Sequence, residues 1–194
     1  MTSLIQVLKV IHILNAILMA WPYYALVASN QRGRLGPPLG GRIDTYFENI
    51  VKNRVYPCFV FQGTALVTGL ALVLLRGLGL DALVTNPVLG LKLLLGVVIT
   101  ALLSYVHLRL QPRIDALFAL TEKPLPAEAA SRIGVLRLRR TRLASICLFV
   151  VLTVSMLGVQ VWISFALWLT GVLVIAIAVF TCWAYKTATP YGWV

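Results

Sequence analysis

Residues 88–110 read VLGLKLLLGVVITALLSYVHLRL, a stretch that is apolar apart from Lys92, His107, Arg109 and a few small polar residues. A helix of about 20 mostly apolar residues crosses the roughly 30 Å hydrocarbon core of a lipid bilayer. No proline interrupts the stretch. It therefore predicts a membrane-spanning helix, and this decides the fold class of the chain.

Four further segments have the same character on either side of this stretch. They are residues 4–28, 55–76, 143–161 and 163–185. Across its 194 residues the chain is 60% hydrophobic and 12% charged, with a mean hydropathy of +0.90, which is far more apolar than a soluble domain. We expect an all-α integral membrane protein, in which residues 1–194 form one bundle of five transmembrane helices in a lipid bilayer.

The least certain boundary separates the last two spans, because residues 143–185 form an almost continuous apolar run. The run is about twice the length of a single crossing. The stretch GVQVWIS, residues 158–164, combines a glycine, a polar glutamine and a tryptophan, which favours a tight turn near the membrane surface. Without such a turn the chain would have four spans.

The distribution of basic residues predicts the orientation of the bundle. The formal net charge is +11, and all basic residues except Lys9, Arg76 and Lys92 lie between spans 1 and 2, between spans 3 and 4, or after span 5. Because the segments richest in lysine and arginine stay in the cytoplasm, we expect the N-terminus outside and the C-terminus inside. This placement explains the charge without nucleic acid as a partner.

The segments between spans carry the other charged residues. Apolar residues recur at helical spacing in residues 43–55, which predicts an amphipathic helix at the inner membrane surface. Pro112 is expected to end span 3, and the basic cluster at residues 137–142 to serve topology and contact anionic lipids. The six acidic residues are all expected in loops: Asp44, Glu48, Asp81, Asp115, Glu122 and Glu128.

Ionisable residues inside the spans are the candidate functional residues, because a charge in a bilayer is costly and by default suggests function. At about 1.5 Å of rise per residue, His12 and Lys92 both fall in the outer leaflet, whereas His107 falls roughly 16 Å from His12, in the inner leaflet. This separation argues against both histidines ligating a single iron, unless the helices are tilted or enter the membrane differently. Structural roles stay open: His12 could bond Asn15, Lys92 could extend to the outer surface, and His107 could lie at the inner interface.

Three stretches resemble the HemJ and CopD-like superfamily of small bacterial membrane proteins: LKVIHILNAILMAW (residues 8–21), YPCFVFQGTALVTGLAL (56–72) and PVLGLKLLLGVVITALLSYVHLRLQPRIDAL (87–117). The shared plan is a histidine early in span 1, a Thr-Gly-Leu step in span 2, and a lysine followed by a histidine in span 3. The resemblance implies heme b, a bacterial cytoplasmic (inner) membrane, and a protoporphyrinogen oxidase-like activity. It also makes His12 and Lys92, with His107 after them, candidate cofactor-binding residues.

Three functional hypotheses follow. The first is a heme b-binding protein that handles electrons or porphyrin, with His12 as the metal ligand. The second is a non-enzymatic subunit of a homo-oligomer or of a larger respiratory or photosynthetic complex, contacting a quinone, porphyrin or pigment. The third is copper transport, for which Met19 and Met156 would add thioether ligands to the imidazole.

Overall fold

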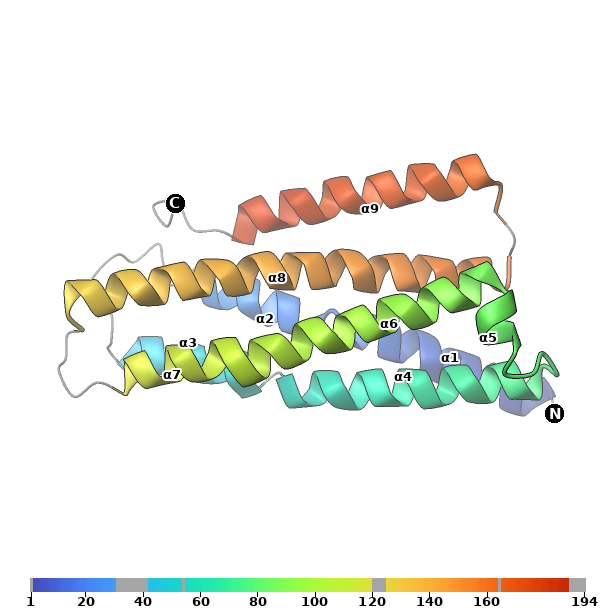
Figure 1. Cartoon of the computed structure of the whole chain (residues 1–194), viewed down its shortest axis with the longest axis horizontal. Coiled ribbons are helices and arrows are strands. Elements are labelled where there is room, and N and C mark those ends of the chain that lie inside the picture. Colours follow the sequence, from blue (N-terminus) through green and yellow to red (C-terminus); the bar gives the residue numbers. More distant parts are fainter. Residues whose placement is uncertain (1, 31–41, 54, 120–124, 164, 189–194) are drawn as a thin grey trace.

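The chain folds into long helices that run side by side (Figure 1). The computed structural model describes residues 2–30, 42–53, 55–119, 125–163 and 165–188. Within these residues, five helices are long and apolar enough to cross a membrane, which confirms the predicted helical membrane fold and five spans rather than four. The elements are α1 (Thr2–Leu18), α2 (Trp21–Asn30), α3 (Arg42–Asn53), α4 (Val55–Leu75), α5 (Ala82–Thr85), α6 (Pro87–Tyr105), η2 (Val106–Leu110), α7 (Gln111–Phe118), α8 (Ala127–Gln160) and α9 (Leu167–Ala188).

The first predicted span, residues 4–28, is interrupted. α1 ends at Leu18 and α2 begins at Trp21, with tight backbone hydrogen bonds at the junction, such as Ala20 N–H to Ile17 O at 3.1 Å. Pro22 explains the break, because its ring has no N–H and clashes with the carbonyl four residues earlier, that of Leu18. The sequence analysis placed one continuous helix over this proline.

We expected Pro112 to end the third span, but it does not. The helix continues from Pro87 to Phe118, and the five residues of η2 form one turn of π-helix, in which the Gln111 N–H bonds to the Val106 carbonyl. In a regular α-helix the ring of Pro112 would clash with the Leu108 carbonyl, and proline has no N–H to donate to that carbonyl. The wider π-helical turn makes room for the ring. The π-helical turn thus accommodates Pro112, and the helix continues as α7.

The fourth span is longer than predicted. α8 has 34 residues and begins at Ala127, so it includes the basic cluster at residues 137–142. Such a helix is about 50 Å long, whereas the hydrocarbon core is roughly 30 Å thick, so one part extends beyond the membrane. α8 ends at Gln160, inside the predicted turn at residues 158–164, and α9 begins at Leu167 rather than at residue 163.

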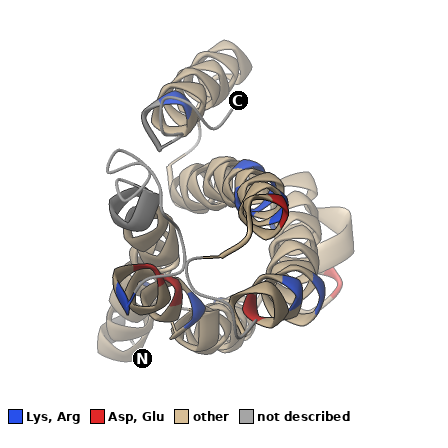
Figure 2. Cartoon of the chain, turned by 90° about the vertical axis from the view of Figure 1, so that its left-hand side faces the viewer, with Lys and Arg blue, Asp and Glu red and all other residues tan. Residues whose placement is uncertain are grey.

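The two ends of the bundle differ in composition. The start of α1, the end of α4, α5 and the end of α8 meet at what we term the α5 end, on the right in Figure 1. At the opposite, α3 end lie α3, α7 and the start of α8. Figure 2 looks at the α3 end, where basic and acidic residues gather. The first turn of α1 and the last turn of α9 lie at opposite ends (Figure 1), as five crossings require.

α9 lies along α8 on the outside of the bundle (Figure 1). Its large apolar side chains are exposed, including Leu167 at 88%, Trp168 at 71% and Trp183 at 62%. A soluble protein rarely presents such a surface, whereas lipid tails solvate it without cost. The outer faces of α1, α4 and α6 are similarly apolar, and the helices are therefore suited to a lipid bilayer.

Candidate functional site

His12 is held between α1 and α4. Its Nδ1 lies 3.0 Å from Thr68 Oγ1, and its ring lies directly over Gly69. A Cβ added at Gly69 would be 3.1 Å from His12 Cε1, which is shorter than an ordinary van der Waals contact between two carbon atoms. The missing side chain at Gly69 thus lets the imidazole lie against α4.

The bond to Thr68 determines which imidazole nitrogen is free. The Thr68 hydroxyl donates its single hydrogen to the Thr64 carbonyl at 2.7 Å, with the Ala65 carbonyl at 3.2 Å. The same oxygen has a lone pair for a hydrogen from His12, and in the tautomer whose proton is on Nδ1 the Nε2 of the neutral ring keeps its lone pair. This is the arrangement of a metal-ligating histidine, whose second ring nitrogen is fixed by a hydrogen bond.

Lys92 lies in the same region but makes no direct bond to His12. Its Nζ would be 3.3 Å from a Cβ added at Gly158, so the ammonium lies against α8 rather than α4. It is nevertheless close enough for its charge to interact with the imidazole of His12. Two of the three predicted site residues are therefore neighbours.

His107 lies apart from them, on the π-turn η2. Its ring makes edge contacts with Tyr56 and Phe59, at centroid distances of 5.2 Å and 6.2 Å, and its buried Nδ1 has no hydrogen-bond partner. Because His12 contacts the same helix at Thr68, the two histidines are separated by roughly 14–18 Å along α4. This agrees with the predicted separation and places His107 outside the His12 region.

Thr68 is a partner of His12 that the sequence did not predict. A carbonyl or Asn15 was the partner considered for a structural His12, but Asn15 Nδ2 donates to the Ile11 carbonyl of its own helix at 2.8 Å. A signal was present, because Thr68 and Gly69 form the Thr-Gly-Leu step noted above. Its meaning depends on which face of α4 meets α1, and uniformly apolar helices do not reveal that.

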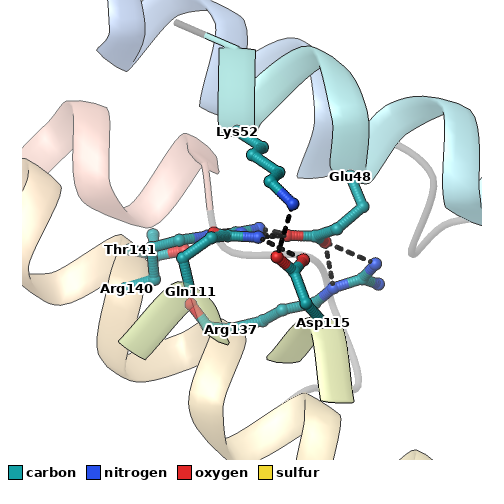
Figure 3. Close-up of polar contacts among 7 residues, drawn as sticks. All are labelled: Glu48, Lys52, Gln111, Asp115, Arg137, Arg140 and Thr141. Atoms are coloured by element: carbon teal, nitrogen blue, oxygen red, sulfur yellow. Dashed lines mark hydrogen bonds and ion pairs between the residues drawn. The ribbon is translucent and has the colours of Figure 1, made fainter. Parts of the chain in front are cut away.

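A second polar group was missed altogether: a buried cluster of charges at the α3 end (Figure 3). The Glu48 carboxylate on α3 accepts hydrogen bonds from Arg137 Nη2 at 2.9 Å and from Arg140 Nη1, both on α8. Gln111 on α7 donates to the same carboxylate at 2.9 Å. The three charged side chains are less than a tenth exposed. They join three helices through one carboxylate.

Two expectations are corrected by this cluster. Asp115 and Glu128 lie in α7 and α8 rather than in loops, whereas Asp44 and Glu48 lie in the helix predicted over residues 43–55. Arg137 and Arg140 are buried in ion pairs rather than facing lipid head groups. Glu122, by contrast, lies outside the described residues.

The cluster extends outward through α7 and becomes more exposed. Gln111 Nε2 donates to Asp115 Oδ1 at 3.1 Å, and Lys52 Nζ lies 2.7 Å from Asp115 Oδ2 (Figure 3). α3 thus turns its acidic face inward, while its apolar Ile43 and Tyr46 are 56% and 65% exposed. The predicted amphipathic helix exists, and its apolar side is free to face lipid.

Other features of the bundle give less support to a binding site. Among the residues that the structure describes, no three histidine, cysteine, aspartate or glutamate side chains lie close enough to hold a metal ion together. Met19 packs against the apolar cluster around Ile99 and Val150. An apolar hollow of about 230 Å³ lies at the break between α1 and α2, lined by Trp21, Pro22, Pro57 and Phe61, and neither His12 nor Lys92 lines it.

Comparison with known proteins adds no relative from which a function could be carried over. No family model, no curated protein and no solved structure matches the chain. The functional argument therefore depends on the residues of this chain alone.

Proposed function

We propose that this is a heme b-binding membrane protein in which His12 is an axial ligand through Nε2. The observation that carries the proposal is the chain of hydrogen bonds from His12 Nδ1 through the Thr68 hydroxyl to the Thr64 carbonyl. It fixes the ring and leaves one basic nitrogen on it. A single imidazole from the protein suffices for heme, because the porphyrin itself supplies four nitrogen ligands to the iron.

The residues around His12 fit this group. Thr68 orients the imidazole, Gly69 makes room for it, and Lys92 supplies a positive charge in the same region. A heme carries two propionate groups, which a buried ammonium would neutralise. When bound, heme would supply one-electron redox chemistry, and the apolar bundle would set its access and potential.

The orientation follows from the charges. We place the α3 end, with most of the basic residues, in the cytoplasm of a bacterial cell and the α5 end outside the inner membrane. His12 and Lys92 then serve the outer leaflet. A reporter enzyme that is active only in the cytoplasm, fused to the last residue, would test this placement. We expect the fusion to be active.

The direct test is the absorption spectrum of the purified protein, oxidised and dithionite-reduced. We expect a Soret band and reduced α-band of heme b, lost or strongly shifted in His12→Ala, because the axial ligand is removed. His107→Ala is the matched control and should keep the spectrum, since His107 lies far along α4. Protein without iron or porphyrin, or equal spectra in the two variants, would refute the proposal.

Two substitutions on α4 test the role of the support. Gly69→Ala should displace the His12 ring and alter the heme spectrum, because the new Cβ would be 3.1 Å from Cε1. Gly63→Ala, on the same helix with no atom within 4 Å of the new Cβ, should leave the spectrum unchanged. If both variants have the wild-type spectrum, the imidazole does not ligate from this position.

A second candidate function is an accessory subunit of a larger membrane complex, and α9 is the observation that favours it. This helix packs along the outside of the bundle and carries Trp168 and Trp183 on its exposed surface (Figure 1). Large aromatic side chains are enriched in protein interfaces as well as at the membrane surface. Gentle detergent extraction and native gels would separate the two functions, because a lone 21.3 kDa species excludes the subunit.

A further inference from the structure

Two cations lie over one tryptophan at the α5 end. Lys9 Nζ on α1 is 4.0 Å from the centroid of the Trp162 ring, and the Arg76 guanidinium carbon, just after α4, is 4.3 Å from it. Neither cation can be farther from the other than the sum of these two distances. The indole therefore brings two positive charges from different helices to one place.

The third cation of this end lies beside them. Lys92 Nζ lies against Gly158 in the last turn of α8, and Trp162 follows in the turn after that helix, where its N–H bonds to the Val159 carbonyl at 3.0 Å. All three basic residues predicted for this side of the membrane thus lie near the C-terminal end of α8, Lys9 and Arg76 over Trp162 and Lys92 against Gly158. We term Lys9, Arg76, Lys92 and Trp162 the cationic cluster.

The described part of the chain offers these cations no acidic partner. Its ion pairs join Lys52 to Asp115, Arg132 to Glu128, and Arg137 and Arg140 to Glu48, and none includes the cationic cluster. Gathering like charges at the edge of an apolar bundle is unfavourable unless an anion balances them.

Helix dipoles do not explain the arrangement either. Arg76 follows the C-terminus of α4, where a cation is favourable, but Lys92 lies in the second turn of α6, whose N-terminal end repels it. Cation–π contact stabilises Lys9 and Arg76 without removing their charge. The charges therefore remain available to a ligand.

We propose that the cationic cluster is a binding site for the anionic head group of an amphiphile. Lys9 and Arg76 would bind its carboxylate or phosphate oxygens, Lys92 would add charge from below, and the Trp162 ring would contact the adjoining apolar part. The site is open to approach, because Arg76 is exposed and Trp162 is 36% exposed. The oxygens would come either from the propionates of a porphyrin, which rests on the function proposed above, or from a phospholipid phosphate.

The porphyrin source is tested with metal-free protoporphyrin IX and its dimethyl ester, titrated by fluorescence into the full-length protein in a neutral detergent. The ester has no anionic oxygens. We expect the free acid to bind the wild type more tightly than the ester, and binding of the acid to weaken about tenfold in Lys9→Gln and in Arg76→Gln, because each removes one charge-assisted hydrogen bond to a carboxylate. Lys186→Gln, which removes a cation at the α3 end, is the matched control.

The lipid source is tested in nanodiscs of phosphatidylcholine alone or with phosphatidylglycerol. If the site binds a phosphate group, phosphatidylglycerol should raise the unfolding temperature of the wild type and of Lys186→Gln, but not of Lys9→Gln or Arg76→Gln. Circular dichroism shows which variants keep their helices, and the two single variants are independent of each other.

Either response supports the site and names its ligand. The proposal is overturned if folded Lys9→Gln and Arg76→Gln behave like Lys186→Gln in both experiments. Neither experiment needs iron, so a chain that binds no heme can still show the site. Conversely, heme ligation by His12 can hold in a chain whose Lys9 and Arg76 variants bind normally, and the two proposals fail separately.

Discussion

The two ends of this bundle differ in how their charged side chains are paired. At the α3 end, Glu48 is bonded to Arg137 and Arg140, and Asp115 is paired with Lys52. At the α5 end, Lys9 and Arg76 lie against an aromatic ring and Lys92 against a helix backbone, with no acidic partner among the described residues. Among the described residues, the ion pairs between helices lie at the α3 end, and none joins Lys9, Arg76 or Lys92 to an acidic side chain.

This difference separates a structural role from a binding role. A buried carboxylate with all its bonds made holds helices in a fixed arrangement but has nothing left to offer a ligand. Cations without a partner lower the stability of the empty protein and are compensated when an anion binds. The ion pairs at the α3 end therefore hold the helices together, and we expect ligands to bind at the α5 end.

The largest effect should come from Glu48→Ala, which leaves Arg137 and Arg140 buried without their carboxylate. We expect the free energy of unfolding in mixed micelles to fall by about 3–5 kcal/mol. Glu128→Ala is the control, because Glu128 makes a surface pair with Arg132 and its side chain is 79% exposed, and it should change stability by less than about 0.5 kcal/mol. Equal losses in the two variants would mean that the buried cluster does not fasten the helices.

A pair of substitutions to methionine should change stability in opposite directions. Arg137→Met breaks a paired charge and should destabilise the protein, whereas Lys92→Met removes an unpaired one and should raise the free energy of unfolding by about 1–2 kcal/mol in ligand-free protein. Unfolding in neutral detergent measures both. Destabilisation by Lys92→Met would show that the ammonium has a partner inside the bundle, and the contrast between the ends would disappear.

The smallest effect compares two glycines of α8. Gly134, toward the α3 end, has no atom within 4 Å of an added Cβ, so Gly134→Ala should stabilise the helix by about 0.5–1 kcal/mol. Gly158→Ala places its Cβ 3.3 Å from Lys92 Nζ, so displacement of the ammonium should cancel that gain. An equal gain at both positions in thermal unfolding would show that Lys92 does not lie against α8.

The sequence was sufficient for the number and approximate limits of the spans, because a bilayer requires long apolar segments whatever their packing. It also located the turn between α8 and α9, near Gln160. It failed at Pro22 and Pro112, which differ in outcome although both follow long apolar runs. The helix ends before Pro22 but continues through Pro112, where it contains one π-helical turn. Which of the two outcomes occurs depends on the packing of neighbouring helices.

The candidate site was predictable only in its ionisable members. His12 and Lys92 stood out because histidine and lysine are rare in apolar spans. Thr68 and Gly69 did not, since small residues are common in membrane helices and become informative only when the facing helix is known. The Glu48 cluster joins segments 63 and 89 residues apart, a pairing that no local pattern of charge reveals.

The π-turn η2 sets the phase of the helix that contains it. Each residue of an α-helix advances the side chains by about 100°, so one additional residue in the turn rotates everything after it by that angle relative to an unbroken helix. Gln111 and Asp115, which follow η2, contact Glu48 and Lys52 of α3. Gln111 also accepts a hydrogen bond from Arg140 in the first half of α8, whereas Lys92, which precedes η2, lies against Gly158 near the end of α8. One rod can thus face two different partners without bending, and deletion of a single residue from 106–110 would turn one of its two halves away.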